Sequence, residues 1–143
     1  MSNEVEISEQ AIHFIESHAE ADYPFECCGF LYGLEDNQRR ITLARRVTNA
    51  KEGDQRRRFK ISPIEYQKAE LFADEHELDL LGIYHSHPDH PARPSEHDLK
   101  QAMPYFSYII ASIKKGQCAK VTSWQLDDNG QFQEERILIE QPK

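Results

Sequence analysis

The chain has 143 residues, of which 38% are hydrophobic, and its formal net charge is −8. This length is enough for one hydrophobic core, so we expect a single domain over residues 1–143. The acidic balance argues against nucleic-acid binding, which needs a basic surface. No apolar run approaches the roughly 20 residues that span a bilayer, and the acidic start does not resemble a secretory signal, so we expect no membrane contact and a cytoplasmic location.

The first part of the chain predicts one helix followed by three strands. Residues 7–21 have the apolar spacing of an amphipathic helix, with Ser8 as its N-cap. The apolar run 27–34 and the alternating run 39–49 are expected to pair as a hairpin, because a short polar turn separates them. Residues 56–61 predict a short third strand.

The second part alternates between helices and strands. Residues 62–78 predict a helix that begins with Ser62 and Pro63 and has Glu65 as a capping-box partner. A strand over 79–87 and a short helix over 95–103 follow, and three more strands are expected over residues 105–113, 119–127 and 131–139. This order predicts an α/β fold: a single mixed β-sheet flanked by helices.

Four of the seven histidines lie within the stretch GIYHSHPDHPARPSEHDL, residues 82–99. In a strand, positions i and i+2 share a face, so His85 and His87 project side by side. The proline-rich loop after them reverses the chain, and the following helix can return Asp98 to the same place. Two imidazoles and a carboxylate match a catalytic zinc site, in which water completes three protein ligands. His90 and His97 are expected to be solvated.

Ordinary structural roles could also account for each of these residues. His85 and His87 could be two unremarkable strand residues, and Ser95 with Asp98 could form only a capping box. Glu26 could be a surface carboxylate before a strand. The basic run 56–60 could be a solvated edge, or a docking patch for an acidic partner.

The spacing His85-x-His87-Pro88-x6-Ser95-x2-Asp98 resembles the signature of the JAMM metalloproteases, also called MPN-plus proteins. A second match is Pro24-x-Glu26-x-Cys28-Gly29, which resembles the family's P-x-E-x-C-G opening. The resemblance covers nearly the whole chain. The chain is too short for the insertions of the eukaryotic deubiquitinases, so it looks like the small bacterial branch.

The resemblance implies a role for each matching position and a JAMM/MPN fold of cytidine-deaminase-like architecture. His85, His87 and Asp98 would hold Zn²⁺, Glu26 would be the general base, and Ser95 would stabilise the oxyanion. The implied reaction is hydrolysis after the Gly-Gly tail of a ubiquitin-like sulfur-carrier protein.

Two other functions and one docking surface are also considered. The chain could be a non-catalytic module or scaffold that binds a ubiquitin-like tail, or a zinc hydrolase of small amides. The first alternative has no need of a base such as Glu26 beside a metal. Arg56, Arg57 and Arg58 are expected to contact an acidic surface of the carrier.

Overall fold

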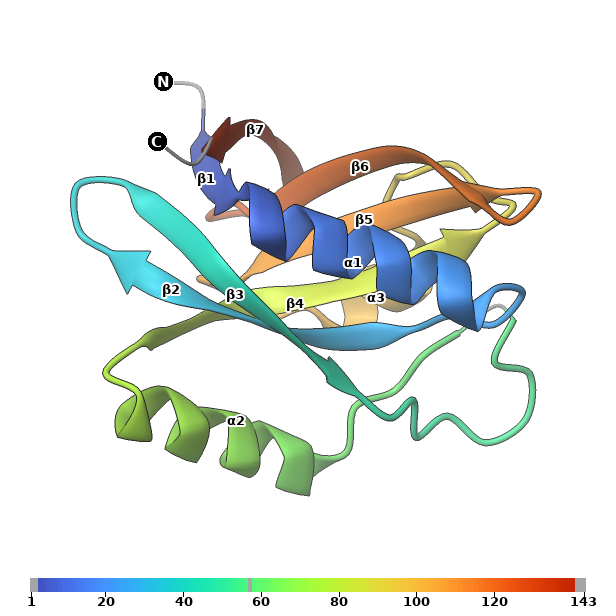
Figure 1. Cartoon of the computed structure of the whole chain (residues 1–143), viewed down its shortest axis with the longest axis horizontal. Helices are drawn as coiled ribbons and strands as arrows, with labels where there is room; N and C mark the ends of the chain where they lie inside the picture. Colours follow the sequence, from blue (N-terminus) through green and yellow to red (C-terminus); the bar gives the residue numbers. More distant parts are fainter. Residues whose placement is uncertain (1–2, 57, 141–143) are drawn as a thin grey trace.

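The computed structural model describes residues 3–56 and 58–140. In chain order the elements are β1 (Glu4–Ser8), α1 (Glu9–Asp22), β2 (Cys28–Glu35), β3 (Arg39–Val47), α2 (Pro63–Glu75), β4 (Asp79–Pro88), α3 (Glu96–Gln101), β5 (Ser107–Lys114), β6 (Gln117–Leu126) and β7 (Phe132–Glu140) (Figure 1). The predicted mixed sheet with helices packed on it is confirmed. None of the helices in the described part of the chain is both long and apolar enough to cross a membrane.

The strands form one mixed sheet in the order β1-β3-β2-β4-β5-β6-β7, which closes into a barrel. Closure depends on β1, a strand that the sequence did not predict, because β1 pairs in parallel with both β3 and β7. Val5 and Ile7 of this strand are fully buried. The acidic residues Glu4 and Glu6 alternate with them along the strand.

The two faces of the sheet carry separate hydrophobic clusters. The first cluster includes α1, which lies across one face (Figure 1), and contains Ile15, Leu31 and Ile109. The second cluster includes α2, and contains Phe30 and Ile83 from the sheet. Side chains alternate along β4, so Tyr84 lies in the first cluster and Ile83 in the second, whose Phe59 stacks on His85.

The N-caps of α1 and α2 are Ser8 and Ser62 as predicted, but only Ser8 makes the capping hydrogen bond. The Ser8 hydroxyl accepts a hydrogen bond from the N–H of Ala11 (3.1 Å), as an N-cap does. Ser62 also occupies the N-cap of α2, yet its side chain makes no capping hydrogen bond. The N–H of Glu65 donates to the backbone carbonyl of Ser62 (3.0 Å) instead, so the predicted capping box is wrong.

The strand predicted over 56–61 is also wrong for the described residues, which form an irregular loop. Phe59 and Ile61 are buried, and their alternation produced the strand signal. The side chain of Asn49 makes hydrogen bonds here of the kind that a neighbouring strand would make with the backbone. Its oxygen accepts from the N–H of Lys60 (3.0 Å), and its amide donates to the carbonyl of Arg58 (3.1 Å).

Candidate active site

His85 and His87 occupy the end of β4, between β2 and β5. Because both neighbouring strands pair with β4, the two imidazoles are held on a rigid, buried part of the sheet. Their exposed fractions are 1% and 7%. The Nε2 atoms of the two rings lie 3.0 Å apart, as the i, i+2 spacing predicts.

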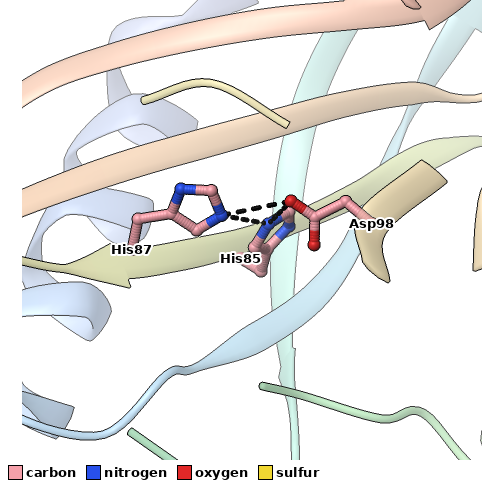
Figure 2. Close-up of side chains that lie close together, drawn as sticks. All are labelled: His85, His87 and Asp98. Atoms are coloured by element: carbon pink, nitrogen blue, oxygen red, sulfur yellow. Dashed lines mark hydrogen bonds and ion pairs between the residues drawn. The ribbon is translucent and has the colours of Figure 1, made fainter. Parts of the chain in front are cut away.

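Asp98 reaches the two histidines from the first turn of α3 (Figure 2). Its Oδ2 atom lies 3.3 Å from Nε2 of His85 and 3.2 Å from Nε2 of His87. The same oxygen accepts a hydrogen bond from the N–H of Ser95 (2.8 Å), while the N–H of Asp98 donates to the Ser95 hydroxyl (3.0 Å). The capping box and the cluster are therefore not alternatives, because the box is what points the carboxylate at the histidines.

Burial and hydrogen bonds shift the pKa of each of these three groups. Burial alone would raise the pKa of Asp98, but His85, His87 and the Ser95 N–H together hold it far below its ordinary value. Burial lowers the pKa of His85 despite the nearby carboxylate. Burial also opposes the charge on His87, yet the hydrogen bonds with Asp98 and Pro91 raise its pKa. Asp98 is thus an anion facing two rings at ordinary pH.

The arrangement of donor atoms fits a metal ion. The carbonyl of Pro91 can only accept, so Nδ1 of His87 carries the proton of their 2.8 Å hydrogen bond. Its Nε2 is then the ring atom left for a metal, and His85, His87 and Asp98 form a group of ligand atoms within 4.8 Å of one another. His85 stacks on Phe59, and its Nδ1 is buried without a partner among the described residues. Two imidazole nitrogens and a carboxylate are a donor set that suits zinc.

Glu26 is brought to this cluster by the pairing of β2 with β4. Cys28 pairs with His85, and the N–H of Ser86 donates to the carbonyl of Cys27 (3.1 Å). Continued by one more step, this antiparallel register sets Glu26 opposite His87. The backbone of Glu26 is held on its other side by the carbonyl of Gln55, which accepts from its N–H (2.7 Å).

The carboxyl group of Glu26 is buried, with 5% of the residue exposed. Burial raises its pKa to about 8; the charge of His87 works in the opposite direction, and that of Asp98 reinforces the rise. A surface carboxylate would not behave in this way, so the simple structural interpretation of Glu26 is wrong. A carboxyl group with a pKa near neutrality can both accept and release a proton.

Ser95 combines a capping role with a free donor. Its hydroxyl oxygen accepts from the N–H of Asp98, and the residue is exposed. The hydroxyl proton therefore stays available to another acceptor.

The predicted docking residues and the two remaining histidines are placed as follows. Arg57 lies outside the described residues, whereas Arg56 and Arg58 are exposed. His90 is exposed as expected, but His97 is half-buried: its Nδ1 lies 3.2 Å from Nη1 of Arg58, and its other nitrogen contacts Gln101. The charge of Arg58 also lowers the pKa of Glu26, so this guanidinium belongs to the surroundings of the cluster.

Two residues around the cluster were missed at the level of sequence. Asn49 holds the loop beside Glu26 by donating to the Glu26 carbonyl (3.2 Å), and Pro91 orients His87. A polar residue just after an expected strand is a signal for Asn49. The role of Pro91 depends on its backbone carbonyl, for which the sequence carries no signal.

Curated relatives of this chain include two desampylases and a conjugate-cleaving protease. A desampylase from Pyrococcus furiosus is 29% identical over 115 residues, which cover 80% of this chain and 76% of the relative. A desampylase from Haloferax volcanii is 32% identical and the match covers 78% and 82%. A probable TtuB-protein conjugate cleaving protease from Thermus thermophilus is 44% identical over 48 residues, 34% of this chain and 32% of that protein.

Solved structures share the fold. A solution structure of a protein from Desulfitobacterium hafniense is 27% identical with a TM-score of 0.84, and the match covers 96% of this chain and 94% of that one. A JAB1/MPN domain protein from Archaeoglobus fulgidus is 20% identical with a TM-score of 0.59, over 94% and 99% of the two chains. The family model for prokaryotic homologs of the JAB domain matches residues 8–127. This chain belongs to that family, the small prokaryotic branch of the JAMM/MPN proteins.

Proposed function

We propose that this protein is a zinc-dependent peptidase or isopeptidase that hydrolyses the amide bond after the C-terminal Gly-Gly of a ubiquitin-like protein. The observation that carries the proposal is the convergence of two imidazole nitrogens and one carboxylate oxygen, within 4.8 Å of one another, beside a buried carboxyl group. The desampylases and the conjugate-cleaving protease among its relatives support the choice of a ubiquitin-like substrate.

His85, His87 and Asp98 would hold the zinc ion through Nε2, Nε2 and Oδ2. When bound, zinc would lower the pKa of a coordinated water and polarise the scissile carbonyl. The low pKa of Asp98 keeps this ligand ionised, and the hydrogen bond from Nδ1 of His87 to the Pro91 carbonyl leaves Nε2 as the ring atom that would bind the metal.

Glu26 would act as the general base and then as the general acid. Its carboxylate takes one proton from the attacking water, whose oxygen forms the new bond to the carbonyl carbon. The carbon–nitrogen bond then breaks, and Glu26 gives its proton to the leaving amine. The Ser95 hydroxyl would donate to the oxyanion that forms in between.

We also propose that the substrate docks through its acidic surface on Arg56, Arg57 and Arg58. The carbonyl of Gln55 accepts from the N–H of Glu26, so this basic run starts one residue from a backbone contact with the general base. The substrate class that this proposal favours is a sulfur-carrier protein, and the reaction would take place in the cytoplasm. A single domain over residues 1–143 would contain all the residues that the reaction needs.

Metal content is the first test of this proposal. We expect about one zinc per wild-type chain by elemental analysis, no zinc in His87→Ala, and unchanged zinc in His90→Ala, whose exposed side chain lies in the next loop. A wild-type protein that takes up no zinc, even when zinc is added back, would refute the proposal.

Turnover separates an enzyme from a binding module. The probe is a ubiquitin-like protein whose C-terminal Gly-Gly is joined to a lysine side chain. Glu26→Gln should keep zinc and substrate binding but lose roughly 10²–10⁴-fold in kcat, because general acid–base work is lost. Equal binding with no turnover by the wild type would favour the module, and cleavage of simple acyl amides alone would favour a small-amide hydrolase.

A further inference from the structure

The loop after β4 is anchored to the sheet at three successive backbone carbonyls. The carbonyl of His90 accepts from the Ser112 hydroxyl (2.5 Å), that of Pro91 from Nδ1 of His87 (2.8 Å), and that of Ala92 from the Thr122 hydroxyl (2.7 Å). The middle carbonyl therefore holds a candidate metal ligand, while its two neighbours are held by β5 and β6.

The two hydroxyl groups lie on the same face of the sheet as the histidines. Ser112 is the partner of His87 in the pairing of β5 with β4. Ile110 pairs with His85 on one side and with Thr122 on the other. Side chains of residues paired in this way point to one face, so β4, β5 and β6 present the two imidazoles and the two hydroxyls together.

The Thr122 hydroxyl is held by a third residue. The indole N–H of Trp124 donates to the Thr122 hydroxyl oxygen (2.8 Å). The carbonyl of Ala92 can only accept, so the same hydroxyl gives its proton to Ala92. Thr122 is 5% exposed and Ser112 is 9% exposed, so water replaces neither bond readily.

We infer that Thr122 and Ser112 are positioning residues for His87. They hold the carbonyls of Ala92 and His90, which fixes Pro91 between them. The Pro91 carbonyl in turn holds the Nδ1 proton of His87 and leaves Nε2 facing His85 and Asp98. Trp124 helps to hold the Thr122 hydroxyl in place by donating a hydrogen bond to its oxygen. The inference rests on the proposed metal site, and it assigns a role to residues outside the family motif.

The test uses Thr122→Val and Ser112→Ala, with Ser123→Ala as the matched control. Ser123 lies on the same strand as Thr122 and is fully buried, but its hydroxyl donates to Glu135 (2.9 Å), away from the loop. Thr122→Ser restores the hydroxyl and is the rescue variant. All variants are compared as purified full-length protein.

The first readout is zinc affinity, measured by competition with a chelating indicator. Thr122→Val and Ser112→Ala should each weaken zinc binding by roughly 10-fold or more, the effect typical of losing a group that orients a ligand. Ser123→Ala and Thr122→Ser should stay within about twofold of wild type. The visible spectrum of the cobalt(II) form should change in the first two variants only.

The second readout needs no metal. Long-range ¹H–¹⁵N spectra of the metal-free protein, at a pH where the ring is neutral, report which nitrogen of His87 carries the proton. We expect the Nδ1–H tautomer in the wild type and a measurable share of the Nε2–H tautomer in Thr122→Val and Ser112→Ala. If tautomer and zinc affinity both match the wild type, the inference is wrong. A tautomer shift in a protein that binds no zinc would overturn the proposed function but not this positioning.

Discussion

Glu26 shows how one side chain acquires its chemistry from its surroundings. The residue is a carboxylate just before a strand, which on its own would be an ordinary surface group. Burial, which leaves 5% of the residue exposed, raises its pKa to about 8 although the nearby His87 opposes the rise. At the same scale, the Oδ2 atom of Asp98 serves both as a helix cap and as a member of the cluster.

Glu26 should make the metal-free protein less stable as the pH rises. Its pKa is raised from 4.5 to about 8 on folding, so the favourable contribution of the protonated form is complete below pH 4.5 and is lost as the pH rises toward 8. In urea unfolding, the stability of wild type relative to Glu26→Gln should therefore fall by up to roughly 4 kcal/mol over this range. A difference that does not depend on pH would contradict the burial of this carboxyl group.

The basic run should affect substrate capture and leave the chemical step alone. Reversing Arg56 and Arg57 to glutamate should raise KM roughly 3- to 10-fold with kcat nearly unchanged, because exposed charges guide an acidic partner. Arg58 is left in place, since its charge also acts on Glu26. Lys68→Glu, an exposed reversal on α2, is the control. Equal KM values for both variants in steady-state assays would remove the docking hypothesis.

At the scale of elements, the site is built where β4, α3 and two loops meet. The sheet holds the histidines, and α3 presents Asp98 through its capping box. The loop between β3 and α2 lies beside Glu26 without being a strand, because one side chain, Asn49, satisfies its backbone at several points.

Removing the Asn49 side chain should loosen this loop. Asn49→Ala leaves the N–H groups of Lys51 and Lys60 without their acceptor and should cost roughly 1–2 kcal/mol of stability. Hydrogen exchange at these two amides should accelerate. Asn49→Asp keeps the acceptor oxygen and should protect them, while Asn37→Ala, in the exposed turn after β2, should change neither. Unchanged exchange in Asn49→Ala would show that the loop is held by other contacts.

At the scale of the whole molecule, closure of the barrel joins the two ends of the described chain. β1 pairs with β7 over five residues, from Glu4 with Arg136 to Ser8 with Glu140. β1 also leads directly into α1, which covers one face of the sheet (Figure 1). Its buried side chains therefore connect the sheet closure to the main core.

Ile7 should be more important for stability than its place near the start of the chain suggests. It is fully buried in the cluster beneath α1. Ile7→Ala should lower the free energy of unfolding by roughly 2–4 kcal/mol, because it leaves a cavity. Ile139 is its partner in β7 but is 49% exposed, so Ile139→Ala should cost less than roughly 0.5 kcal/mol. Similar midpoints for both variants in urea would mean that β1 contributes little to the core.

The sequence by itself determined the features that depend on neighbours along the chain. His85 and His87 share a face because of strand periodicity. Asp98 was predictable because it lies three residues after Ser95, the expected start of a helix. The first helix and the hairpin of β2 and β3 were predictable in the same way, from apolar spacing and turn residues. These signals depend only on residues close together in the sequence, so they can be recognised without knowledge of the fold.

Only the tertiary structure decided the features that depend on distant contacts. β1 became a strand because it pairs with β3 and β7, whereas residues 58–61 form a loop in which the Asn49 side chain bonds the Arg58 carbonyl and the Lys60 N–H. The pKa of Glu26 depends on His87 and Asp98, which are distant in sequence. The loop after β4 is likewise held by Ser112 and Thr122, each more than 20 residues from its partner. Burial and hydrogen-bond partners of this kind arise only when the chain has folded, so the pattern of residues could suggest the site but not its environment.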